Sequence, residues 1–215
     1  MPTIDEFKRL KSYACRIRRI TYLPYVRHKD TIFPQDQKAL RALLSYHNFG
    51  DHPFFPNLRQ VEFVDAKHAV NCLDIFLLTK SISLSLFWDD SGSDGRFSPA
   101  FRKLFLNIEK RALNMEELDL GSFQSGSAVN TVQDPQDLSD LVYKMSELRG
   151  LATGSRLLTL DAFCHLASLP RLRKLQTPNT SRDILESIRT LHCPLFPELQ
   201  QLTLHETPLP DLSPA

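Results

Sequence analysis

The 215-residue sequence lacks the features that mark several large classes of protein. It has no apolar run of roughly 18 residues, which argues against a membrane-spanning helix. Its N-terminal residues include acidic and basic side chains and no apolar segment of the secretory type. The cysteines at positions 15, 72, 164 and 193 form no C-x-x-C pair. We therefore expect an intracellular protein, in the cytoplasm or the nucleus, with reduced thiols that are mostly buried.

An excess of charge of either sign is also missing. The chain has 26 Lys and Arg residues against 25 Asp and Glu residues, which gives a net charge of +1. No overall field attracts it to nucleic acid or to a membrane surface, so we predict neither as a partner. With 42% hydrophobic residues, the chain can bury a core of its own. We expect a single domain over residues 1–215.

One short pattern occurs near both ends of the chain. Residues 55–63 read Phe-Pro-Asn-Leu-Arg-Gln-Val-Glu-Phe, and residues 196–204 read Phe-Pro-Glu-Leu-Gln-Gln-Leu-Thr-Leu. After the Phe-Pro turn, each stretch places apolar residues at i, i+3 and i+5. The last two share one face of a strand, because side chains alternate along it. Such a strand cannot bury its apolar face alone, so we expect further copies between these two.

The same frame can be followed through the whole chain. Seven frames begin at residues 17, 58, 81, 115, 148, 172 and 199, with a mean spacing of about 30 residues. The third is the weakest, because its first position falls on Ser81. Helical periodicity separates the frames, and a further helical stretch begins at Phe7. The predicted helices between frames cover residues 39–46, 66–79, 99–113, 135–145, 159–168 and 181–191.

These strands and helices predict an α/β leucine-rich-repeat solenoid with about seven strand–helix repeats and a parallel sheet on its concave face. The alternative is an open doubly wound sheet, whose strands are near-continuous apolar runs because helices cover both faces. Here the i+2 and i+4 positions are mostly polar, so one face of the sheet is expected to meet water.

The water-facing positions are the candidate binding residues. Neighbouring repeats form a broad, shallow surface, which suits a protein partner better than a small substrate. Phe87 and Trp88 follow the third strand and are predicted to act as aromatic anchors. Charged and polar positions would set polarity and register. The predicted set is Arg19, Gln60, Glu62, Ser83, Ser85, Phe87, Trp88, Glu117, Asp119, Lys174, Gln176, Gln201 and Thr203.

The sequence offers no catalytic, cofactor-binding or metal-binding residues that we would assign. Its seven histidines are dispersed, and the Cys164–His165 and His192–Cys193 pairs are direct neighbours that diverge by about 100° on a helix. Residues 121–126 lack the lysine of a phosphate-binding loop. The stretch 90–95 is a turn by composition. A basic cluster at residues 8–19 is either a solvated face or a contact for phosphate or an acidic partner.

Several of these stretches resemble one known family. Ile4-Asp-Glu-Phe7 followed by Tyr13-Ala-Cys-Arg-Ile17-Arg resembles the segment after the F-box in fungal F-box proteins with irregular leucine-rich repeats. The strands after Pro56 and Pro197, and Ile-Ser-Leu-Ser-Leu at 82–86, are similar to the repeats of that family. The resemblance covers nearly the whole chain.

The resemblance implies the substrate-recognition repeats of a ubiquitin-ligase receptor, in which the F-box docks the ligase adaptor and the repeats hold the target. Residues 1–16 are too short for an F-box, so we expect a fragment of a longer chain, and an adaptor as partner only if an F-box lies upstream. The missing cover after residue 208 fits this expectation. The alternatives are a stand-alone repeat scaffold or adaptor with no ligase role, and an enzyme with a deep pocket.

Overall fold

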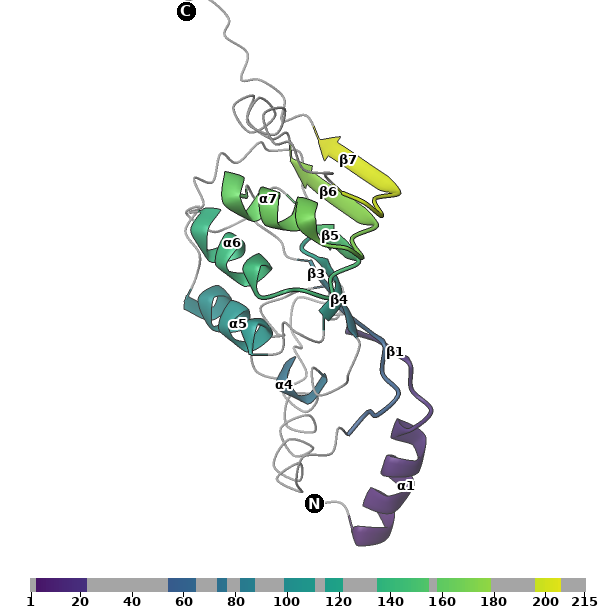
Figure 1. Cartoon of the computed structure of the whole chain (residues 1–215). Helices are drawn as coiled ribbons and strands as arrows, with labels where there is room; N and C mark the ends of the chain where they lie inside the picture. The colour runs from purple at the N-terminus through teal and green to yellow at the C-terminus, as the bar shows by residue number, and fades with distance from the viewer. Residues whose placement is uncertain are drawn as a thin grey trace, which may run out of the picture.

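A computed structural model of the chain describes residues 3–22, 54–64, 73–76, 82–87, 99–110, 115–121, 135–154, 158–178 and 196–205. In these residues a single parallel sheet has helices packed against one side, so the fold is mixed α/β (Figure 1). Trp88, the predicted helices at 39–46 and 181–191, and most of the one at 66–79 lie outside the described residues. So do Cys72, the His192–Cys193 pair and the turn at 90–95.

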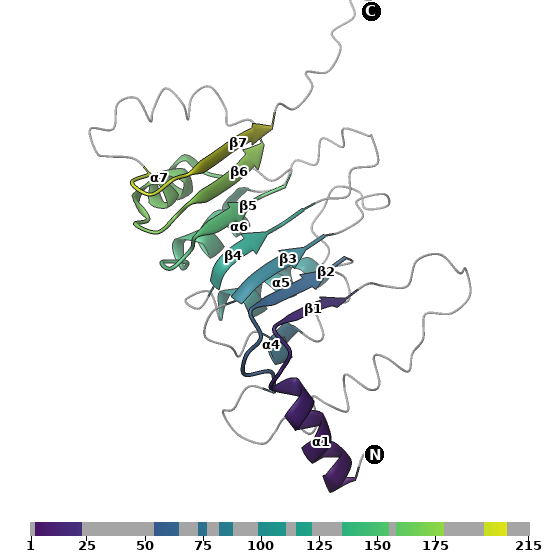
Figure 2. The ribbon, with the colours of Figure 1, turned by 90° about the vertical axis from the view of Figure 1, so that its right-hand side faces the viewer.

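The seven described strands pair in chain order and all run parallel, as the repeated frame predicts (Figure 2). Every neighbour in the sheet is also the next strand in the sequence, so no strand crosses over another. The strands are β1 Arg19–Tyr22, β2 Gln60–Phe63, β3 Ile82–Leu86, β4 Met115–Asp119, β5 Gly150–Ala152, β6 Lys174–Pro178 and β7 Gln201–His205.

The strand register aligns the predicted i+3 positions across the whole sheet. They form one continuous row: Ile20, Val61, Leu84, Leu118, Leu151, Leu175 and Leu202. The weak third frame departs from the prediction in one detail. Ile82 pairs with Met115 and Ser83 with Glu117, so β4 holds one extra residue, Glu116, at a bulge. Ile82, and not Ser81, therefore occupies the position equivalent to the first apolar residue of the fourth frame.

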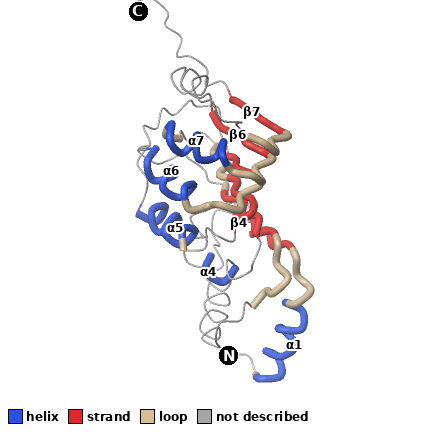
Figure 3. Tube along the Cα trace, viewed as in Figure 1, coloured by secondary structure: helices blue, strands red, loops and turns tan. Residues whose placement is uncertain are grey.

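The described helices between strands lie on one face of the sheet, where α5, α6 and α7 pack side by side (Figures 1 and 3). The sheet follows a shallow arc with these helices on its outer side. The helix α1 lies beyond β1, at the N-terminal end of the sheet (Figure 2). The helices are α1 Ile4–Ala14, α4 Leu73–Phe76, α5 Pro99–Glu109, α6 Pro135–Tyr143 and α7 Leu160–Ser168.

The helix boundaries follow local signals in the sequence. The Thr159 hydroxyl accepts a hydrogen bond from the Ala162 N–H at 3.3 Å and caps α7 where the helix was predicted to begin. Thr3 and Glu6 form a capping box at the start of α1. Helix α5 ends at Glu109, and residues 111–113 of the predicted helix lie outside the described residues.

The core lies between the sheet and these helices. The inward-facing row of β2 to β6 is buried, together with one apolar stripe from each of α5, α6 and α7. The helix residues include Leu104, Phe105, Ile108, Leu138, Leu141, Val142, Phe163 and Leu166. Full burial of one such side chain contributes about 1.5–3 kcal/mol, so this layer holds the helices on one face.

The two copies of the Phe-Pro stretch share a backbone hydrogen bond, although Phe196 has a positive φ of 57° and Phe55 does not. The Leu58 N–H donates to the Phe55 carbonyl at 3.2 Å, and the Leu199 N–H donates to the Phe196 carbonyl at 3.2 Å. Each leading phenylalanine also packs on an aromatic ring of a helix. Phe55 stacks on Phe76 of α4, which follows it in the chain, at 5.6 Å between ring centroids, and Phe196 meets Phe163 of α7, which precedes it, edge-on at 5.5 Å. The repeated sequence thus produces the same hydrogen bond at both ends of the sheet, with a different helix packed on each phenylalanine.

The structure bears on two predictions, one about the burial of the cysteines and one about membrane-spanning helices. Cys15 and Cys164 are free thiols, but Cys15 is exposed and Cys164 is half-buried. Cys15 departs from the expected burial because it lies just past the end of α1, and Cys164 is only partly covered. Within the described ranges, every helix is too short or too polar to cross a membrane.

Replacing Leu118 with alanine tests whether the inward-facing row holds the sheet to its helices. Leu118 is 1% exposed, whereas Leu106 on α5 is 51% exposed. We expect Leu118→Ala to lower the free energy of unfolding by about 2–5 kcal/mol, since it leaves a cavity. Leu106→Ala should change it by less than about 0.5 kcal/mol. Equal losses in urea unfolding would contradict this core assignment.

Candidate functional site

The face of the sheet opposite the helices carries two rows of residues in register. The first open-face row contains Arg19, Gln60, Ser83, Glu117, Gly150, Lys174 and Gln201. The second open-face row contains Thr21, Glu62, Ser85, Asp119, Ala152, Gln176 and Thr203. Eleven of the predicted binding residues fall in these rows, because residues i+2 and i+4 of each frame share a face. Phe87 lies just beyond, and Trp88 is outside the described residues.

Three residues of these rows were not predicted from the sequence. Thr21, Gly150 and Ala152 occupy the same frame positions as the predicted residues on their strands. A search for polar side chains overlooks Gly150 and Ala152, because both are small and carry no polar side-chain atom. Their position in the fifth frame was the signal that could have found them.

Small residues on β5 create a hollow in the middle of the open face. Its volume is about 300 Å³, and it extends over β4, β5 and β6 toward β3 and β7. Gly150 and Ala152 contribute no large side chain to its floor. The side chains of Glu117 and Asp119 lie toward β4, and those of Lys174 and Gln176 lie toward β6. The hollow therefore has an acidic wall and a wall with one cation.

Hydrogen bonds orient two of the open-face carboxylates. The Glu62 carboxylate accepts from the Arg19 guanidinium at 2.9 Å and from the Thr21 hydroxyl at 3.2 Å. The Glu117 carboxylate accepts from the Ser83 hydroxyl at 2.9 Å. The Glu117 stem lies over Gly150, where an added Cβ would stand 3.3 Å from the Glu117 Cγ. Glu117 thus reaches from its hydrogen bond on β3 to the glycine on β5.

Asp119 has a different environment from the other two carboxylates. Partial burial raises the pKa of its carboxyl group above the ordinary value, and the nearby negative charge of Glu62 raises it further. A hydrogen bond from the Gly121 backbone N–H lowers the pKa, with a smaller effect than burial and a larger one than Glu62. Negative charge on Asp119 is therefore only partly compensated, which favours contact with a hydrogen-bond donor or a cation from a partner.

Phe87 lies at the C-terminal end of the open face, next to Asp119. A Cβ added at Gly121 would overlap the Phe87 ring and would stand 3.6 Å from the Asp119 carboxylate oxygen. The ring therefore covers Gly121, and only glycine at that position permits this close packing. Phe87 is half-buried, so part of its ring is exposed beside the polar rows.

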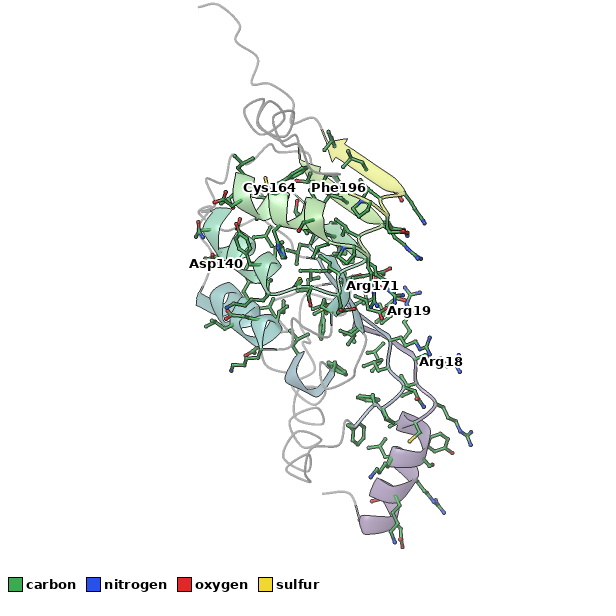
Figure 4. The ribbon with its side chains drawn as sticks, viewed as in Figure 1. Arg18, Arg19, Asp140, Cys164, Arg171 and Phe196 are labelled. Atoms are coloured by element: carbon green, nitrogen blue, oxygen red, sulfur yellow. The ribbon has the colours of Figure 1, made fainter. Side chains whose placement is uncertain are left out.

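The Cys164–His165 pair lies away from this face. Both residues belong to α7, and Figure 4 shows Cys164 on the helix side of the sheet. The His165 ring lies 5.3 Å from the Tyr143 ring. Its Nε2 is buried without a hydrogen-bond partner, and burial lowers the pKa of the imidazole. Within the described ranges, His, Cys, Asp and Glu side chains do not converge in threes as metal ligands would.

The open face offers charges, hydroxyl groups and amides over a broad area, with one shallow hollow and one aromatic ring. Such groups can form directional hydrogen bonds and ion pairs with the surface of another molecule. The described titratable side chains of the hollow, Glu117, Asp119 and Lys174, are spread over β4 and β6.

Replacing Asp119 with asparagine tests the charge on this face. Because the pKa of Asp119 is raised, the folded protein holds this proton more tightly than the unfolded chain does. The wild type should therefore lose stability as the pH rises through the raised pKa. We expect Asp119→Asn to be more stable than the wild type in urea unfolding at about pH 7, with the difference vanishing at about pH 3. Glu198→Gln, which removes an exposed charge, is the control, and an equal gain there would contradict the assignment.

Comparison with known proteins identifies no relative of this chain. No family model, no curated protein and no solved structure matches the chain. The function is therefore inferred from the sheet, its open-face rows and its hollow.

Proposed function

We propose that this chain is a leucine-rich-repeat solenoid whose open sheet face binds another protein. Four observations support the repeat assignment: the seven frames, their common register, the strand order, and the helices on one face. The two Phe-Pro turns with matching hydrogen bonds support it further. In a solenoid each repeat contacts mainly its neighbours, which leaves one face of the sheet free for a ligand.

The hollow over β5 is the observation that carries the proposal. Its walls have opposite charge, with Glu117 and Asp119 on one side and Lys174 on the other. Its shape is shallow and its lining comes from several strands, so a protein surface fits it better than an enclosed small molecule. Phe87 beside Asp119 adds an apolar contact at the end of the face. The proposed role is binding without chemistry.

Within this role, we propose that the repeats recognise the substrate of an F-box-like ubiquitin-ligase receptor. The support is the resemblance of residues 4–18 and of the Phe-Pro strands to that family. The alternative is a stand-alone scaffold that uses the same face with no ligase role. The full transcript distinguishes the two, because the ligase role requires an upstream reading frame that encodes an F-box.

Site-specific photo-crosslinking tests the binding face in cells. A photoreactive phenylalanine at Gln176, in the hollow, should capture a defined protein partner. The same residue at Asp140, an exposed position that Figure 4 shows on α6 at the helix side, should not capture it. Identical crosslinks from both positions, or no crosslink from Gln176, would contradict the proposal.

The captured partner can then be purified and its affinity measured by calorimetry. We expect Glu117→Lys combined with Asp119→Lys to weaken binding at least about tenfold, because the charge of one wall is reversed. Lys174→Glu reverses the charge of the other wall on an exposed side chain, so it tests the same surface with little effect on folding. Unchanged affinity in both variants would rule out the hollow as the binding site.

A further inference from the structure

A row of arginines marks the N-terminal ends of the strands, outside the hollow. Each arginine directly follows the first apolar residue of its frame, so the repeat places all of them at one edge of the sheet. We name this set, Arg18, Arg59, Arg149 and Arg173, the arginine row. All four side chains are exposed. Figure 4 shows Arg18, with its neighbour Arg19, extending away from the helices.

Backbone hydrogen bonds fix the arginine row as two adjacent pairs. The Arg59 N–H donates to the Arg18 carbonyl at 2.8 Å, which joins the ends of β1 and β2. The Arg173 N–H donates to the Arg149 carbonyl at 2.8 Å, which joins the ends of β5 and β6. Neighbouring strands are about 4.8 Å apart, so each pair brings two cationic side chains close together.

Between the pairs, the same edge carries no basic residue among the described ones. On β3 the buried Ile82 directly precedes Ser83, the partner of Gln60, and so lies level with Arg59 on the β2 side. On β4 the bulged Glu116 directly precedes Glu117. The Glu116 carboxylate lies 3.7 Å from the Arg149 guanidinium. For Arg18, Arg59 and Arg173, no carboxylate of the described residues lies within ion-pair distance. Along the sheet, this edge is therefore basic at β1 and β2, neutral at β3, acidic at β4, and basic at β5 and β6.

Adjacent like charges are unfavourable in the free protein. Like charges directly opposite each other on neighbouring strands destabilise a sheet. Arg18 and Arg59 directly precede β1 and β2 and are joined by a backbone hydrogen bond, so they form such a pair. Arg173 places an uncompensated cation beside Arg149, which is itself paired with Glu116. An anionic ligand across each pair would remove this repulsion and form charge-assisted hydrogen bonds.

We propose that the arginine row is a second binding surface, which takes a protein segment with two groups of acidic side chains. The two arginine pairs are separated by three strand spacings, or about 14 Å between β2 and β5. An extended segment covers that distance in about four residues, so the acidic groups would stand about four residues apart. A basic or neutral residue between them would face Glu116. This surface uses different side chains from the hollow and stands whether or not the hollow binds a partner.

The charge pattern favours a protein segment over nucleic acid. A nucleic acid backbone carries negative charge at every step, so it would be repelled where Glu116 lies. Glu198 next to β7 adds further negative charge along this edge, whereas Glu147 next to β5 is ion-paired with Arg171. A polypeptide can place its acidic residues only where the arginine pairs lie.

A synthetic peptide with two Glu-Glu pairs about four residues apart, and a lysine between them, is the probe for this surface. We expect it to bind the full chain at about 0.15 M ionic strength, and a peptide with glutamine in place of glutamate not to bind. Arg18→Gln, Arg59→Gln and Arg173→Gln combined should weaken binding at least about tenfold. The same variant should unfold at a higher urea concentration than the wild type, because the repulsion is removed.

The matched control removes three cations from α1, with Lys8→Gln, Arg9→Gln and Lys11→Gln combined. These side chains are exposed and lie outside the arginine row, so affinity for the peptide should stay within about twofold of the wild type. The proposal is overturned if the control weakens binding as much as the arginine variant. It is also overturned if the wild type does not bind the peptide, or binds a single-stranded oligonucleotide of equal length more tightly.

Discussion

The structure depends on aligning alternate residues of seven parallel strands, so that one row of apolar side chains is buried from β2 to β6. A shift of one residue in any strand would turn its apolar row toward water and its polar rows into the core. The row from Ile20 to Leu202 stays aligned across every pairing, and the bulge at Glu116 restores the alignment where β3 is one residue short. The helices of one face can then cover a continuous apolar surface.

The same constraint produces the open face. Since side chains alternate along a strand, aligned buried rows force the intervening residues into aligned rows on the other side. The hollow exists because two of those positions, Gly150 and Ala152, are small while their neighbours on β4 and β6 are large. Charges from separate repeats are brought together in this way, with Glu117 and Asp119 facing Lys174 across the space above β5.

The alignment of the strands also sets which residues lie at the edge of the sheet where the strands begin. Residues that follow the first apolar position reach the surface where the strands begin, and their backbones are joined by hydrogen bonds from strand to strand. Whatever side chain the repeat carries there becomes part of a row. In this chain four of those positions are arginine, which gives the edge an electrostatic character that the net charge of +1 does not reveal.

The sequence by itself determined the strands, their parallel pairing in chain order, and which side of β2 to β6 faces the core; on β7 the predicted inward residues Leu202 and Leu204 are exposed. Periodicity is a local property, and the repeated frame leaves few ways to bury seven half-apolar strands. It also located α7 to within one residue, because Thr159 is a capping residue next to an apolar helical stretch. Only the tertiary structure showed that Ile82 replaces Ser81 in the frame, that Glu117 reaches over Gly150, and that Phe87 covers Gly121. These features arise from contacts between repeats some 30 residues apart, and side-chain size and register decide them in three dimensions.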